Sequence, residues 1–319
     1  MQSLKKTSTM ADLTRLGLGT WAWGGGGWAY GWGRQDEKSC VDTLETALSL
    51  GISWVDTAPV YGLGRAETIL GKAMKVLKVR PFVATKCGLA WNEKRKVFPC
   101  LSKKSVLDEA EQSLRRLGVD MIDLYQIHWP VPEKDIEEAW DTVEELRLKG
   151  WIRFAGVSNF SLEQLTRVHR IHPVSTLQPP YSMFMRDIDA DLLPFCQKKG
   201  IGVLTYSPMQ KGMLTDKFTR EWVAGLPSDD HRTRDPMFKE PRLSDNLRTV
   251  SSLKTIANEC GLSLSQLAIA WCLRSGAVTS AIVGARTPMQ IRETAGIVNV
   301  RLEEGVIEQV NRILDGRTG

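Results

Sequence analysis

The stretch Lys149-Gly150-Trp151-Ile152-Arg153-Phe154-Ala155-Gly156-Val157 contains the junction that decides the fold class. Glycine readily adopts the left-handed conformation that ends a helix, so Lys149-Gly150 predicts a helix end. The apolar run that follows, 152–157, predicts a strand. The same junction occurs at Lys199-Gly200, which leads straight into the run 201–205. A helix that runs directly into a strand, twice, predicts βαβ units and a parallel sheet.

Short apolar runs of this kind recur along the chain, and between them lie longer segments with helical spacing and many charges. Eight parallel strands, each followed by a helix, predict a closed (β/α)8 barrel, or TIM barrel. An open doubly wound sheet is the structural alternative. The expected strands are residues 16–19, 52–55, 82–85, 122–127, 152–157, 174–177, 201–205 and 281–283.

Local signals place several helix boundaries. Asp36-Glu37-Lys38 opens a helix that we expect to end at Leu50-Gly51, and Ser102 and Ser161 are predicted N-caps. After the seventh strand, the Pro- and charge-rich stretch 226–243 predicts an insertion. On the mouth of a barrel such a loop would cover the site. Further expectations are helices over 245–260 and 263–273, a C-terminal helix, and a hairpin or loop over 5–15 that plugs the barrel bottom.

Composition favours an ordinary globular protein. The 319 residues are 42% hydrophobic and 25% charged, and one barrel domain can span all of 1–319. The net charge of +5 is small and dispersed, so neither nucleic acid nor a membrane is an expected partner. The six cysteines form no CxxC pair and no zinc-type spacing, so we expect no metal and a reducing compartment. The interpretation is a cytoplasmic protein, a monomer or a weak homo-oligomer.

Polar residues or glycine turns follow nearly every expected strand. In a barrel these positions ring one mouth, where barrel active sites are found. A single such residue is weak evidence, because buried polar groups often serve only to satisfy hydrogen bonds. Seven at corresponding places predict a site. They are Asp56, Lys86, His128, Ser158 with Asn159, Gln178, Tyr206, and Gly284 with Arg286.

Asp56 and Tyr61 flank a Pro-containing turn after the second expected strand, and Lys86 ends the third. A phenol has an unperturbed pKa of ~10, so it needs a nearby cation to act as an acid near neutral pH. We expect Asp56 to keep Lys86 charged, and Lys86 to lower the pKa of Tyr61. Two alternatives remain: an ion pair that only organises the barrel, and a neutral Lys86 that forms a Schiff base, as in some barrel aldolases.

Four motifs stand at the ends of the expected strands. They are Asp56-Thr57-Ala58 with Tyr61-Gly62, Glu67 and Leu70-Gly71; Ala84-Thr85-Lys86; Asp123-Leu124-Tyr125-Gln126-Ile127-His128-Trp129; and Gly156-Val157-Ser158-Asn159-Phe160. Together they resemble the aldo-keto reductase family, and the resemblance covers nearly the whole chain. The chain is similar to a bacterial branch of NADPH-dependent reductases and polyol dehydrogenases whose chains begin with Gly-Leu-Gly-Thr-Trp, here 17–21.

The resemblance implies a catalytic tetrad of Asp56, Tyr61, Lys86 and His128. It further implies that the nicotinamide delivers hydride to a carbonyl carbon while Tyr61 donates a proton to the oxygen, which His128 orients. The expected substrates are therefore small aldehydes or ketones, including sugar-derived ones, and the expected cofactor is NADPH. Gly284 stands where several relatives have a lysine, so NADH is the alternative cofactor.

The resemblance also implies a set of cofactor contacts. Ser158, Asn159 and Gln178 would hold the carboxamide, Tyr206 would stack on the nicotinamide, and Arg286 would favour the adenosine 2′-phosphate. The loop from Ser207 would wrap the pyrophosphate. The remaining implied contacts are Gly19, Thr20, Trp21, Asp56, Pro208, Met209, Lys211, Gly212, Leu214, Gly284, Gln290, Glu293 and Thr294.

The first loop is rich in glycine and aromatic residues. Gly17-Leu18-Gly19 is not a dinucleotide fingerprint and Gly24–Gly27 is not a P-loop, because neither has the residues that must follow. Aromatic side chains suit the wall of a pocket for a small organic molecule. We expect Trp21, Trp91 and Trp129 to contact the substrate. The functional alternative to a reductase is a regulatory subunit that binds the nicotinamide but turns over little.

Overall fold

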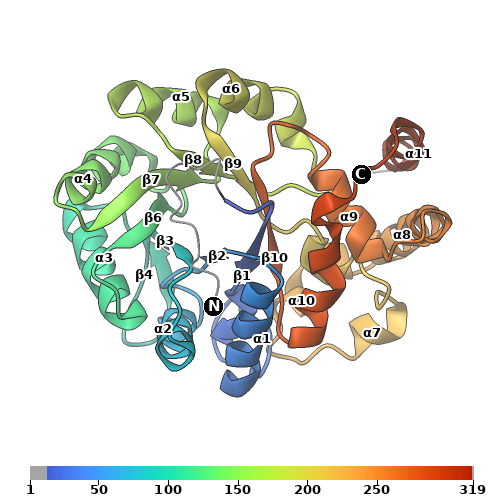
Figure 1. The fold of residues 1–319 in the computed structure, drawn as a ribbon, viewed down its shortest axis with the longest axis horizontal. Coiled ribbons are helices and arrows are strands. Elements are labelled where there is room, and N and C mark those ends of the chain that lie inside the picture. The colour runs from blue at the N-terminus through green and yellow to red at the C-terminus, as the bar shows by residue number, and fades with distance from the viewer. Residues whose placement is uncertain (1–12, 318–319) are drawn as a thin grey trace.

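The computed structural model describes residues 13–317, which contain a closed barrel of eight parallel strands (Figure 1). Leu16 and Gly19 of β1 pair with Ala281 and Gly284 of β10, and this register closes the sheet. The predicted TIM barrel is confirmed, and the open-sheet alternative is wrong. The barrel strands are β1 (Leu16–Gly19), β2 (Trp54–Asp56), β3 (Phe82–Cys87), β6 (Ile122–Ile127), β7 (Ile152–Ser158), β8 (Thr176–Gln178), β9 (Gly202–Thr205) and β10 (Ser280–Gly284).

Helices surround the barrel, as Figure 1 shows. The predicted caps are confirmed: the side chains of Asp36, Ser102 and Ser161 each accept a hydrogen bond from a backbone N–H in the first turn. Gly150 and Gly200 both have a positive φ, as a helix end requires. The first six helices are α1 (Glu37–Ser49), α2 (Arg65–Leu77), α3 (Lys103–Leu117), α4 (Ile136–Leu148), α5 (Leu162–Ile171) and α6 (Leu192–Lys199).

The predicted insertion follows β9 and carries more structure than its composition indicated. Short 3-10 turns, η5 (Gln210–Gly212), η6 (His231–Arg234) and η7 (Pro236–Phe238), interrupt it. The two predicted helical segments are confirmed as α8 and α9, although α8 begins earlier than expected. The helices of this half are α7 (Arg220–Ala224), α8 (Arg242–Glu259), α9 (Leu264–Cys272), α10 (Pro288–Ala295) and α11 (Glu304–Asp315).

The predicted C-terminal helix is α11, which packs against α8 at the side of the barrel (Figure 1). An antiparallel hairpin that the sequence did not indicate, β4 (Leu89–Trp91) and β5 (Val97–Pro99), follows β3. Most of the expected hairpin or loop over 5–15 lies outside the described residues.

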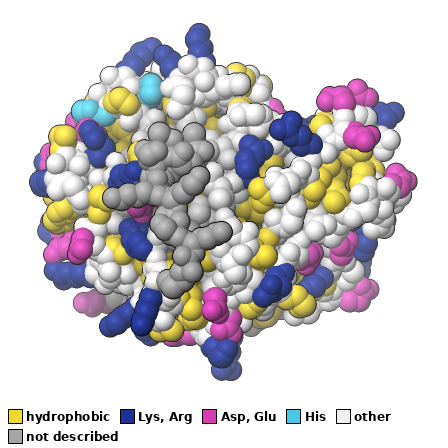
Figure 2. All heavy atoms as spheres, in the orientation of Figure 1, with side chains coloured by type: hydrophobic (Ala, Val, Ile, Leu, Met, Phe, Trp, Pro, Cys, Tyr) yellow, Lys and Arg dark blue, Asp and Glu magenta, His cyan; other side chains and the backbone are white. Residues whose placement is uncertain are grey.

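The distribution of charges on the surface is mixed, as the small and dispersed net charge predicts. Figure 2 shows Lys and Arg side chains interspersed with Asp and Glu over the face that it presents. Within residues 13–317, every helix is too short or too polar to cross a membrane.

Candidate active site

The buried pair of Lys86 and Asp56 is the core of the site at the barrel mouth. Lys86 Nζ lies 2.7 and 2.8 Å from the two carboxylate oxygens of Asp56 and donates to the Thr57 carbonyl at 2.9 Å. Lys86 is fully buried and Asp56 is 3% exposed. The three acceptors match the three N–H donors of an ammonium group, so this geometry holds Lys86 in its charged form.

Tyr61 and His128 lie next to this pair and are only partly buried. The Tyr61 hydroxyl is 3.4 Å from Lys86 Nζ. The His128 ring stands edge-on to the Tyr61 ring, with 5.9 Å between their centroids. The structure therefore brings together the four predicted residues from the ends of β2, β3 and β6 and from the turn after β2.

The expected lowering of the Tyr61 pKa is wrong. Burial raises the pKa of Tyr61 well above its ordinary value, and the Asp56 charge raises it further. Asp56 offsets part of the Lys86 charge at 2.7 Å, so the remaining field of Lys86 does not outweigh the cost of burying a phenolate. Burial likewise lowers the pKa of His128 well below its ordinary value, with the Lys86 charge adding to the effect. Near neutral pH the site thus presents a protonated phenol and an uncharged imidazole.

A polar network extends from Asp56 across the mouth. Gln178 Nε2 donates to Asp56 Oδ1 at 2.8 Å, and Ser158 Oγ donates to the Gln178 carbonyl at 2.8 Å. Asn159 has a positive φ of 63°, and its amide donates to the His128 carbonyl at 2.9 Å. The Tyr206 hydroxyl donates to Asn159 Oδ1 at 2.7 Å, which fixes the ring. Amide, hydroxyl and aromatic groups therefore converge beside the tetrad, and this donor set fits a nicotinamide carboxamide and ring.

The cations expected near phosphates already have partners in this structure. Lys211 Nζ lies 2.7 Å from Asp235 Oδ2. The Arg286 guanidinium donates to Gln35 Oε1 at 2.8 Å, to the Trp32 carbonyl at 3.1 Å and to the Arg34 carbonyl. These contacts tie both cations to neighbouring loops. Each cation keeps N–H donors that these contacts do not use, because an ammonium group has three and a guanidinium has five.

The other predicted cofactor residues lie around the same mouth, and their roles stay predictions. Open space surrounds Gly284, and the hydroxyl of Thr20 donates to the Asp56 carbonyl. Gln290 accepts from the Arg286 backbone N–H, and Glu293 accepts from Ser265. Thr294 is buried within α10. The residues Gly19, Ser207, Pro208, Met209, Gly212 and Leu214 lie at the end of β1 and in the loop after β9.

Of the expected wall residues, Trp21 packs against the tetrad. Its ring stacks on Tyr61 with 6.3 Å between centroids and 24° between planes. Trp91 is on β4 and is partly buried, and Trp129 follows β6 and is 43% exposed. Trp21 therefore forms a wall beside the catalytic phenol, while the other two are at the rim.

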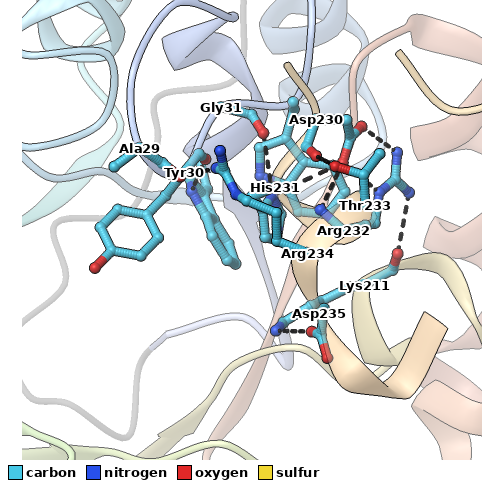
Figure 3. Close-up of polar contacts among 12 residues, drawn as sticks. Ala29, Tyr30, Gly31, Lys211, Asp230, His231, Arg232, Thr233, Arg234 and Asp235 are labelled. Carbon is cyan, nitrogen blue, oxygen red and sulfur yellow. Dashed lines mark hydrogen bonds and ion pairs between the residues drawn. The ribbon is translucent and has the colours of Figure 1, made fainter. Parts of the chain in front are cut away.

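The insertion contributes residues that the sequence interpretation missed. His231 of η6 packs on Trp21, with ring centroids 4.8 Å apart, and its backbone N–H donates to the Gly31 carbonyl at 2.9 Å. Asp230 binds the Arg232 guanidinium through both carboxylate oxygens (Figure 3). The only sequence signal for His231 was that a histidine lies in a charge-rich stretch. Nothing in that stretch indicated that it would contact the first loop.

Comparison with known proteins agrees with this geometry. The family model described as "Aldo/keto reductase family" matches residues 15–315. "Aldo-keto reductase YhdN" of Bacillus subtilis is 38% identical over 99% of this chain and 94% of its own length. "NADH-specific methylglyoxal reductase" of Escherichia coli is 33% identical over 95% of each chain.

The solved structure of the glycerol dehydrogenase AKR11B4 of Gluconobacter oxydans is also similar. Its sequence is 39% identical, its TM-score is 0.86, and the match covers 96% of this chain and 93% of that one. The chain belongs to the aldo/keto reductase family.

Proposed function

We propose that the protein reduces small aldehydes and ketones to alcohols with a nicotinamide cofactor, and that Tyr61 is the proton donor. The observation that carries this proposal is the tetrad geometry: a protonated phenol lies 3.4 Å from an ammonium group that a buried carboxylate holds in place. Methylglyoxal and glycerol in the names of two relatives support small oxygen-rich substrates.

The reduction needs a hydride and a proton. When bound, the cofactor supplies the hydride that the carbonyl carbon accepts. Tyr61 gives its phenolic proton to the carbonyl oxygen, and the neighbouring Lys86 stabilises the negative charge that then develops on the phenolate oxygen. His128, uncharged near neutral pH, orients the carbonyl oxygen by a hydrogen bond. In alcohol oxidation Tyr61 would act as the base.

Cofactor binding is proposed at the polar network of Ser158, Asn159, Gln178 and Tyr206. NADPH is the proposed preference, with Arg286 as the residue that meets the 2′-phosphate. The NADH-specific relative shows that NADH also serves within the family. A cytoplasmic location and a monomeric or weakly associated state stay predictions.

Isotope transfer tests the proposal directly. With NADPH, and separately NADH, deuterated at the transferable C4 position, reduction of methylglyoxal or glyceraldehyde should place deuterium on the former carbonyl carbon, as mass spectrometry would show. Tight NADPH binding with no deuterated product from a panel of aldehydes would instead support a regulatory subunit.

The aldolase alternative makes a different prediction. A Schiff base at Lys86 requires a neutral amine, but three acceptors surround Nζ and match the ammonium form. Borohydride added with a carbonyl substrate should therefore leave the mass of the peptide containing Lys86 unchanged. A stable adduct at Lys86 would overturn this assignment.

A further inference from the structure

Two complementary polar atoms without partners belong to neighbouring rings, one from the first loop and one from the insertion. Trp32 Nε1, an N–H donor, and His231 Nε2 are both buried and have no hydrogen-bond partner among residues 13–317. The two rings are 4.8 Å apart between centroids and meet edge to face. A buried polar group left unpaired is destabilising, so two of them on neighbouring rings require an explanation.

The tautomer of His231 follows from its other nitrogen. Nδ1 lies 3.1 Å from the Gly31 carbonyl (Figure 3). A carbonyl can only accept, so Nδ1 carries the hydrogen. Nε2 is therefore a lone-pair acceptor. Burial lowers the pKa of His231 to about 4, which keeps this tautomer uncharged at neutral pH.

The partner ring is also held in place. The Arg232 guanidinium lies 4.5 Å from the Trp32 ring centroid, and Asp230 holds that guanidinium through both oxygens (Figure 3). The Trp32 carbonyl accepts from Arg286 at 3.1 Å, and its backbone N–H donates to the Gly25 carbonyl at 3.1 Å. A fixed donor and a fixed acceptor thus lie on neighbouring rings from segments about 200 residues apart in the sequence.

We infer that Trp32 Nε1 and His231 Nε2 form a subsite that binds a hydroxyl group of the substrate. A hydroxyl is at once an acceptor for an indole N–H and a donor for an imidazole lone pair, so one group satisfies both atoms. Neither an aldehyde oxygen nor a methyl group can do this. The inference rests on the proposed reductase function and adds to it a preference for carbonyl compounds with a hydroxyl group remote from the carbonyl.

The subsite lies on the catalytic side of the barrel. Trp21 contacts both His231 and Tyr61, with ring centroids at 4.8 and 6.3 Å, so a single indole separates the subsite from the proton donor. A substrate that reaches both places spans several carbon atoms. Entry of the hydroxyl requires a small separation of the two rings, because both atoms are buried in this structure.

Shape-matched aromatic aldehydes test the subsite. Each pair compares a (hydroxymethyl)benzaldehyde with the ethylbenzaldehyde of the same substitution pattern, at position 3 or position 4. The two members differ only in that a hydroxyl replaces a methyl group, and at these positions the hydroxyl cannot cyclise onto the aldehyde. The wild-type enzyme should show a higher kcat/KM for the hydroxymethyl member of at least one pair. His231→Asn keeps a donor for Gly31 but removes the Nε2 acceptor, and should lower that preference about tenfold with little change for the ethyl aldehyde.

Matched tryptophan variants complete the test. Trp32→Phe should lower the preference as well, whereas Trp28→Phe, whose indole donates to Gly25 in the same loop, should leave it unchanged. No preference in the wild-type enzyme, or an equal loss for both aldehydes in His231→Asn, would overturn the subsite and favour a direct bond between the two rings. Absence of NADPH- or NADH-dependent reduction of the ethyl aldehydes would instead contradict the proposed function.

Discussion

At the scale of single residues, Lys86 keeps its positive charge because each N–H group of its ammonium has an acceptor. Asp56 and Thr57 take up three N–H donors inside a fully buried site. The motifs predicted which residues meet, but they did not predict the direction of the Tyr61 pKa shift, because that depends first on burial and then on the Asp56 charge. The sequence shows which groups are adjacent, whereas desolvation is a property of the packed site.

Asp56→Asn should strongly destabilise the protein. The change leaves a buried ammonium without its carboxylate and places an amide donor against Gln178, so we expect a loss of about 3–5 kcal/mol. Urea unfolding followed by circular dichroism would measure it. The control is Asp42→Asn, which breaks the exposed pair with Lys38 and should leave the urea midpoint unchanged. Equal midpoints for the two variants would contradict the role of the buried pair.

Glu109 should make stability fall as pH rises. It is buried on α3, where it accepts from Gly88 N–H and Ser105, and burial raises its pKa from 4.5 to about 7. Between these values the folded chain keeps a proton that the unfolded chain has lost. This difference corresponds to roughly 3 kcal/mol that is present below pH 4.5 and lost as pH rises through 7.

The variant Glu109→Gln cannot titrate and tests this pH dependence. Its free energy of unfolding should vary less between pH 4.5 and 7 than that of the wild type. Denaturant titrations at several pH values would show the difference, and parallel curves for the two proteins would exclude Glu109 as the source.

At the scale of elements, the eight strands were predictable because each lies in a short, mostly apolar run that leads into glycine or a polar residue. The helices with capping serines and aspartate were predictable for the same local reason. The hairpin of β4 and β5 was not, because its strands have three residues each and alternate weakly. The sequence did not predict the turns η6 and η7 either, since they depend on contacts with the first loop.

Gly71→Ala should separate two helices of the barrel. An added Cβ would lie 2.3 Å from the Arg116 carbonyl oxygen and 2.9 Å from that of Leu117, at the end of α3. Backbone cannot move aside as a flexible side chain can, so we expect a loss of roughly 1–3 kcal/mol or more. Thermal unfolding would measure it against Gly276→Ala, whose Cβ meets open space. A tolerated Gly71→Ala would show that α2 and α3 can shift apart.

At the scale of the whole molecule, contacts between distant segments close the mouth. His231 meets Gly31, and Arg286 joins the start of α10 to the first loop. Such pairs have no periodicity that a sequence reveals, because each is fixed only when the barrel closes. This is why the tetrad could be predicted, whereas the Trp32 and His231 subsite could not.

Arg286→Met should loosen the first loop. It removes the hydrogen bonds to Gln35 and to the carbonyls of Trp32 and Arg34. Hydrogen exchange followed by mass spectrometry should show faster exchange over residues 31–36, with β-strand peptides unchanged. Arg115→Met, which removes only an exposed pair with Glu111, is the control. Unchanged exchange over 31–36 in Arg286→Met would mean that other contacts hold the loop.

The central claim is that Tyr61 donates the proton at the barrel mouth. Tyr61→Phe removes one hydroxyl and keeps the ring that packs against Trp21 and His128. Steady-state reduction of methylglyoxal should lose roughly 10²–10⁴-fold in kcat, while NADPH binding measured by fluorescence stays at the wild-type level. A variant that reduces methylglyoxal at the wild-type rate would contradict the assignment of Tyr61.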